Sequence, residues 1–156
     1  MQTNTHGKTA TRAASNEKLQ ECLRGELSAM ETYELALKSV THVGLHNSLQ
    51  EIFVSHARRV ERLRERIVRS GAEPTESSGV WGAFAKGVQA GADLLGDRTA
   101  IAVLEAGEDR GLELYTKGLE DCDAGTWKLI ATELLPEQQR THELCRTLKS
   151  YVNAPS

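Results

Sequence analysis

The sequence predicts an all-α protein folded as an antiparallel four-helix bundle. Apolar residues recur at alternating intervals of three and four along four long segments, which is the spacing of the buried face of a packed helix. Aromatic residues make up 4% of the 156 residues and there are three prolines, a composition that suits helices better than sheets. A chain of this length forms one domain with a sizeable core, and we place that domain at residues 16–152.

The first half of the chain predicts a helical hairpin. Residues 1–15 are polar and show no periodicity, so we expect a disordered tail before a helix over 17–40. A tight turn at 41–44 leads to a second helix that ends near residue 70, and such a short turn makes the two helices antiparallel neighbours. The predicted buried faces are Leu19, Leu23, Glu26, Met30, Tyr33 and Leu37 in the first helix, and His46, Leu49, Phe53, His56, Val60, Leu63 and Ile67 in the second.

The second half predicts another hairpin after a long connection. Residues 71–97 are long enough to cross the bundle from end to end, and they include a glycine-rich stretch at 80–95 that we expect to form a short extra helix. Helices follow over 98–120 and 126–152, with a kink at Pro136 and a frayed end at 153–156. Their predicted faces are Ile101, Leu104, Glu108, Leu112, Tyr115 and Leu119, then Ile130, Leu134, Glu137, Thr141, Leu144, Leu148 and Tyr151.

A short pattern occurs twice and places a carboxylate in each of two apolar faces. Glu26 follows a glycine and precedes Tyr33 by seven residues, and Glu108 stands in the same relation to Tyr115. A lone carboxylate costs several kcal/mol to bury, roughly, so each one must be paired, protonated or bound to a metal ion. The repeat therefore predicts a polar site inside the bundle, with the two tyrosines beside it.

The candidate metal ligands are Glu26, His56, Glu108, His142 and Glu137, because carboxylate and imidazole groups suit iron, manganese or zinc. Bundle carboxylate sites take a Glu from each of two helices and a Glu-x-x-His from each of the other two. Here Phe53 and Gln139 occupy the positions three residues before His56 and His142. Glu137 lies five residues before His142, and such residues point about 140° apart on a regular helix.

The chain resembles the ferritin-like superfamily, and most closely an uncharacterised bacterial family catalogued as a domain of unknown function. The residues that carry this resemblance are Gly25-Glu26 with Tyr33 and Gly107-Glu108-Asp109 with Tyr115, supported by the Gly-Ala-Glu-Pro turn at 71–74 and by His142. The resemblance covers about residues 17–150. It implies a ferritin-like bundle that works as a dimer. It also implies that Glu26 and Glu108 match the metal carboxylates, and that His56 and His142 match the metal histidines. Phe53 and Gln139 depart from the bridging carboxylates of that family.

Two functions follow as alternatives. The first is a degenerate ferritin-like protein with weak iron, zinc or manganese binding and oxidative or iron-handling activity. The second is a metal-free, stress-associated structural or interaction protein, with Tyr33 and Tyr115 tethering the buried carboxylates. A third and weaker reading is anion binding by the arginines of the second helix, which we expect on its solvated face: Arg58, Arg59, Arg62, Arg64, Arg66 and Arg69.

Net charge, cysteine count and the length of apolar runs restrict the partners and the location of the protein. The net charge of −3 argues against a nucleic-acid partner. Three cysteines without metal-type spacing indicate reduced thiols in a cytoplasmic protein. The sequence has no run of 18 apolar residues, so we expect no membrane-spanning helix. The incomplete ligand set argues against an enzymatic role without excluding one.

Overall fold

The structure is a computed structural model that describes residues 5–79, 86–87 and 96–155. The described residues are helical or lie in turns and loops, without a strand among them, so the all-α prediction is confirmed. The helices are α1 (Thr5–Ser39), α2 (Val43–Arg69), α4 (Asp97–Thr116), α5 (Ala124–Leu129) and α6 (Leu135–Asn153), with a 3-10 turn at Leu119–Asp121 and a π turn at Ile130–Leu134. None of the described helices is both long and apolar enough to cross a bilayer.

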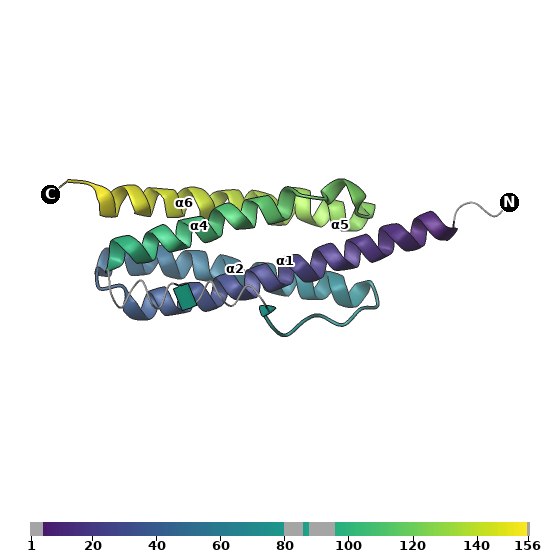
Figure 1. Cartoon of the computed structure of the whole chain (residues 1–156), viewed down its shortest axis with the longest axis horizontal. Coiled ribbons are helices and arrows are strands. Elements are labelled where there is room, and N and C mark those ends of the chain that lie inside the picture. Colours follow the sequence, from purple (N-terminus) through teal and green to yellow (C-terminus); the bar gives the residue numbers. More distant parts are fainter. Residues whose placement is uncertain (1–4, 80–85, 88–95, 156) are drawn as a thin grey trace.

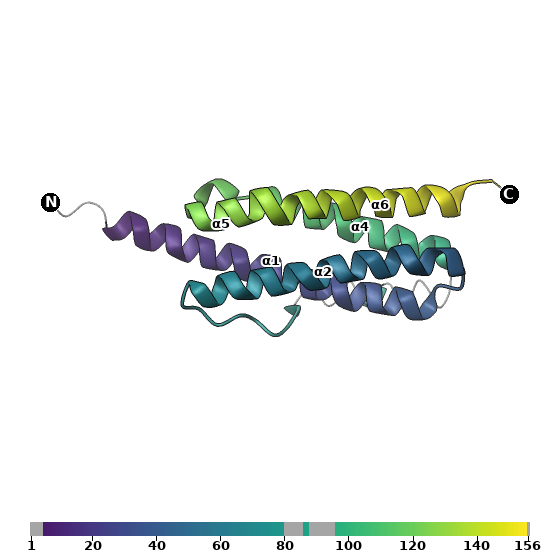
Figure 2. The ribbon, with the colours of Figure 1, turned by 180° about the vertical axis from the view of Figure 1, so that it is seen from behind.

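The helices form a bundle of two antiparallel hairpins. Figures 1 and 2 show α1 packed beside α2 in one layer and α4 beside α6 in the other, with α1 lying against α4. Helix α2 ends at the end of the bundle where α5 lies, and α4 begins at the opposite end (Figure 1), so the connection between them spans the bundle. The short helix expected at 80–95 falls outside the described residues apart from 86–87.

Helix α1 includes part of the segment 1–15 that we expected to be a tail. Helix α1 begins at Thr5 rather than near residue 17. The Nη2 atom of Arg12 donates to the carbonyl of Ser70 at 2.6 Å, and the Ser15 hydroxyl accepts from the backbone N–H of Asp123 at 2.7 Å. These contacts reach residues far away in the sequence, so local periodicity does not reveal them.

Two loop contacts hold the hairpins together at one end. Asp97, the first residue of α4, accepts from the backbone N–H groups of Thr41 and His42 at 3.0 and 2.9 Å.

At the other end of α2, Gly71 adopts a φ of +83°, and the N–H of Ala72 donates to the carbonyl of Ile67. This glycine-dependent cap ends the helix as the sequence predicts.

The predicted distortion near Pro136 is present as a π turn. Proline has no backbone N–H to donate one turn back, which favours a widened turn immediately before it. In α6, Thr141 and Leu148 are buried as predicted, but the buried face differs by one residue at two positions. Gln138 is buried in place of Glu137, Cys145 is buried in place of Leu144, and Tyr151 is 57% exposed.

The core has two apolar halves. One half contains residues from the turn between α1 and α2, and the other contains residues from the α5 end of the bundle. The first half includes Val40, Leu45, Leu49, Ile101 and Leu148, and the second includes Leu19, Leu23, Leu63, Ile67 and Ile130. Buried polar residues of the long helices, among them Glu26, His56, Glu108 and Gln138, lie between these two groups.

Candidate functional site

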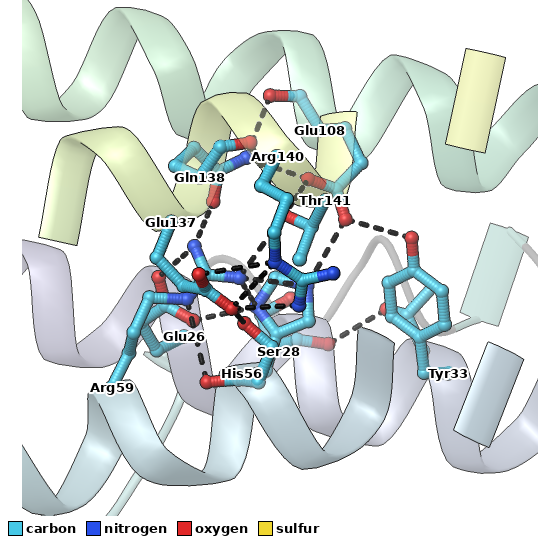
Figure 3. Close-up of polar contacts among 12 residues, drawn as sticks. Glu26, Ser28, Tyr33, His56, Arg59, Glu108, Glu137, Gln138, Arg140 and Thr141 are labelled. Carbon is cyan, nitrogen blue, oxygen red and sulfur yellow. Dashed lines mark hydrogen bonds and ion pairs between the residues drawn. The ribbon is translucent and has the colours of Figure 1, made fainter. Parts of the chain in front are cut away.

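A layer of buried polar side chains separates the two apolar halves. Each long helix contributes at least one member, and Figure 3 shows most of them meeting around the centre of the bundle. All of them are at most 4% exposed. The layer, called here the central cluster, consists of Glu26 and Tyr33 from α1, His56 and Arg59 from α2, Glu108 and Tyr115 from α4, and Gln138 and Thr141 from α6.

The two copies of the sequence repeat pair crosswise in the central cluster. The Tyr33 hydroxyl donates to Oε1 of Glu108 at 2.7 Å, and the Tyr115 hydroxyl donates to Oε1 of Glu26 at 2.5 Å. Burial, and next the charge of the bonded carboxylate, raise the pKa of both tyrosines well above 10.0, so each phenol keeps its proton. The repeat therefore ties α1 to α4 twice, once through each copy.

His56 lies between the two carboxylates. Its Nδ1 atom is 2.6 Å from Oε2 of Glu26, and its Nε2 atom is 3.1 Å from Oε1 of Glu108. Burial and the charge of Arg59 lower the pKa of His56, but the charge of Glu26 and hydrogen bonds with both carboxylates raise it above 6.5 overall. Since ionised carboxylates only accept, both ring nitrogens carry hydrogen and the ring is an imidazolium.

Arg59 supplies the second buried positive charge. Its side chain is 2% exposed, and its Nη1 atom lies 3.1 Å from Oε1 of Glu26. Burial alone would raise the pKa of Glu26, but the charge of Arg59 and the bonds from His56 and Tyr115 lower it below 4.5. The cluster thus contains two carboxylates and two cations, and it carries no net charge.

The four carboxylate oxygens of the central cluster all have partners within the chain. Burial alone would raise the pKa of Glu108, but bonds from His56 and Tyr33 lower it below 4.5. The remaining oxygen of Glu108, Oε2, accepts from Nε2 of Gln138 at 2.7 Å and from the Thr141 hydroxyl at 2.9 Å. On α6 the two positions three residues apart that face the cluster thus carry an amide and a hydroxyl, where a bundle metal site has a carboxylate and an imidazole.

The structure brings three of the five predicted ligands together and places two elsewhere. Nε2 of His142 lies 2.6 Å from Oδ1 of Asp109, a residue whose side chain is 63% exposed. Glu137 accepts from the Ser55 hydroxyl at 2.7 Å and pairs with Arg140 at 2.7 Å, outside the central cluster. Within the described part of the chain, no group of three or more His, Cys, Asp and Glu side chains is arranged to hold a metal ion.

Sequence reasoning missed Arg59 and Gln138. Arg59 was expected on the solvated face, yet it continues the buried positions of α2 at intervals of three and four: Leu49, Ile52, His56, Arg59 and Leu63. That spacing is a signal that the sequence offers. Gln138 offers the same kind of signal, since the buried positions Leu134, Gln138, Thr141, Cys145 and Leu148 follow at intervals of four and three. Three of the other arginines pair with acidic residues: Arg62 with Glu133, Arg64 with Glu61, and Arg66 with Asp123.

A small cavity lies between α1 and α4 beside the central cluster. It has a volume of about 50 Å³, and Gly25, Ala29, Leu104, Gly107 and Leu114 are among the residues that line it. Ligand pockets are typically several hundred Å³, roughly 300 or more, whereas a single water needs about 10–15 Å³ of such volume. The cavity therefore has room for a few water molecules at the cluster.

Gly111 makes the close approach of α4 to α6 possible. A Cβ atom there would lie 2.4 Å from Nε2 of Gln138, whose amide also donates to the backbone carbonyl of Glu108 at 3.0 Å. We expect Gly111→Ala to lower the free energy of unfolding by about 1–3 kcal/mol, because Gln138 must leave Glu108. Gly7→Ala is the matched control, since nothing lies within 4 Å of its added Cβ. Urea denaturation of both variants measures the difference, and equal stabilities would contradict the prediction.

Fold and site together define a helical bundle with a charge-balanced polar layer in its core. Residues 14–121 match the model of the family described as Domain of unknown function (DUF2383), and the chain belongs to that family. A search of curated proteins and a search of solved structures give no match.

Proposed function

We propose that this protein is a metal-free, non-enzymatic bundle of ferritin-like type. It forms a homodimer, and it acts by binding other macromolecules. Its central cluster has a structural role in this proposal: it fixes the axial register of the four long helices. Apolar side chains tolerate sliding of one helix along another, whereas a buried charged group must meet its partner. A layer to which every long helix contributes selects one register for the whole bundle.

The observation that carries this proposal is the internal pairing of both buried carboxylates. The carboxylate oxygens of Glu26 form hydrogen bonds or ion pairs with Tyr115, Arg59 and His56. Those of Glu108 form them with Tyr33, His56, Gln138 and Thr141. A metal ion needs deprotonated ligands with free lone pairs, and here the imidazole is protonated and bonded on both sides. The residues present therefore do not fit the di-iron centre of ferritin-like proteins.

Two further features support a protein without a catalytic site. The cavity beside the cluster, about 50 Å³, is too small for an ordinary substrate. Cys22 and Cys145 are fully buried, and burial raises the pKa of Cys145 to about 12, so this thiol stays protonated and unreactive at neutral pH. At the central cluster, the oxidative or iron-handling alternative has neither a complete ligand set nor room for a reactant.

The test is the metal content of the full chain, purified without chelator and measured again after incubation with ferrous iron. We expect less than roughly 0.1 metal ion per chain, and a melting temperature that neither iron nor a chelator changes, because a bound ion would stabilise the folded state by mass action. Glu26→Gln/Glu108→Gln is the comparison variant. Near-stoichiometric metal in the unmodified chain that disappears in this variant would contradict the proposal.

Association is measured separately by sedimentation velocity on the same samples. A dimer at micromolar concentration is the expected result, and a monomer at every concentration would remove the homodimer while leaving the metal-free core untouched. The two parts of the proposal therefore fail independently.

A further inference from the structure

The guanidinium of Arg59 lies in a cage of oxygen and nitrogen atoms from three helices. Its Nη1 atom is 3.1 Å from Oε1 of Glu26 and also bonds Oε1 of Gln138. Its Nη2 atom is 3.0 Å from Nδ1 of His56 and 3.3 Å from Oγ1 of Thr141. A carboxylate, an imidazole, an amide oxygen and a hydroxyl thus surround one buried cation.

The charge balance of the cage depends on this cation. With Arg59 present, two carboxylates face two positive groups, and the cluster is neutral. Without its guanidinium, Glu26 and Glu108 would face His56 alone, and the cluster would carry one net negative charge in a water-poor environment. Such a charge must be neutralised by protonation or by another cation.

One contact in the cage shows that the two cations crowd each other. Nδ1 of His56 already donates to Oε2 of Glu26 at 2.6 Å, so its contact with Nη2 of Arg59 sets two donors face to face. A divalent ion in the vacated space would carry the charge of the guanidinium and of the Nδ1 proton that it displaces to solvent, so the cluster would stay neutral with the ion bound. Neutral imidazole, carboxylate and amide oxygen are ligands that divalent first-row metals accept.

We propose that Arg59 is a built-in cation that closes the central cluster to metal ions, and that removal of its guanidinium converts the cage into a divalent metal site formed by Glu26, His56 and Gln138, with Thr141 and Glu108 beside it. This inference rests on the proposed metal-free function. It goes beyond that proposal by assigning the exclusion of metal to one side chain.

In the experiment, Mn²⁺ is titrated into the full-length Arg59→Ala chain, and the concentration of unbound Mn²⁺ is measured by electron paramagnetic resonance. Mn²⁺ prefers oxygen and nitrogen ligands, so the three free cysteines do not compete for it. We expect one Mn²⁺ per variant chain, bound roughly a hundredfold more tightly than by the unmodified protein, because a positive charge a few Å away no longer opposes the ion.

Three companion variants make the result specific. Arg59→Ala/Glu26→Gln removes the carboxylate of the site and should bind no better than the unmodified chain. Arg62→Ala removes an arginine whose side chain is 41% exposed and should also match the unmodified chain. Arg59→Gln ends short of the guanidinium position and is titrated in parallel, because Arg59→Ala loses more of its packing.

The outcomes separate this inference from the proposed function. Tight Mn²⁺ binding by the Arg59 variants and not by the unmodified chain supports it. Binding by neither Arg59 variant, or equal binding by the Glu26 double variant, overturns it and leaves the metal-free function standing. Stoichiometric binding by the unmodified chain would overturn both.

Discussion

Arg59→Met is expected to lower the free energy of unfolding by about 3–5 kcal/mol, because it leaves the buried carboxylate of Glu26 without its nearest arginine partner. Methionine keeps much of the apolar volume of the side chain and removes only the charged end. Glu26→Gln should have an effect of similar size, since it leaves the guanidinium inside the core against a neutral amide. Urea denaturation followed by circular dichroism measures both variants.

The double variant decides whether the loss is electrostatic. Because each single change strands a charge that the other change removes, Glu26→Gln/Arg59→Met should be more stable than the sum of the two single effects predicts. The matched control is Arg62→Met, whose ion pair with Glu133 is about half exposed, and it should cost at most about 1 kcal/mol. A coupling energy near zero between Glu26 and Arg59 would contradict a charge-balanced core.

The stability of the bundle is expected to fall on both sides of a plateau between about pH 4.5 and pH 6.5. The pKa values of Glu26 and Glu108 lie below 4.5 in the folded state, so the unfolded chain binds more protons there and stability is lost as pH falls through the folded pKa values. The pKa of His56 lies above 6.5 in the folded state, so the folded chain holds its proton longer, and stability is lost as pH rises through that pKa.

His56→Gln tests the alkaline side of this profile. The variant should be less stable than the unmodified chain near pH 6, and its stability should then stay flat as pH rises to about 9.0, above which the buried thiols and then the buried tyrosines, whose pKa values burial raises, make the folded state less stable. His6→Gln is the control, because His6 lies about 30 Å from Glu26 along the same helix. Chemical denaturation at intervals of pH gives the profile, and an unchanged alkaline slope in His56→Gln would show that another group is responsible.

Helical periodicity was enough to predict the four long helices and much of the core. Leu19, Leu23, Leu49, Leu63 and Ile101 are fully or almost fully buried as predicted, because an apolar residue every three or four positions has one way to avoid water. The same spacing predicted that Glu26, His56 and Glu108 would be buried together with Tyr33 and Tyr115. Each of these residues interrupts or continues an apolar face, which is a local property of the sequence.

In α6, the prediction of which residues are buried was wrong by one residue at two positions, Gln138 and Cys145. A shift of one position rotates a side chain by about 100° around the helix axis, which is enough to exchange a buried residue for an exposed one. The π turn at Ile130–Leu134 precedes both positions, and Gln138 is buried in place of Glu137. The extension of α1 before residue 17 was not predicted for a different reason, since Arg12 and Ser15 contact Ser70 and Asp123, which are distant in the sequence.

The sequence by itself determined the all-helical fold, the two hairpins and the presence of a polar layer with paired carboxylates. Only the tertiary structure decided what that layer is. Tyr33 bonds Glu108 and Tyr115 bonds Glu26 across the two halves of the repeat, and Arg59 adds a second buried cation to the layer. The physical reason is that periodicity gives the direction of a side chain about its own helix, whereas its partners depend on how helices distant in the sequence pack.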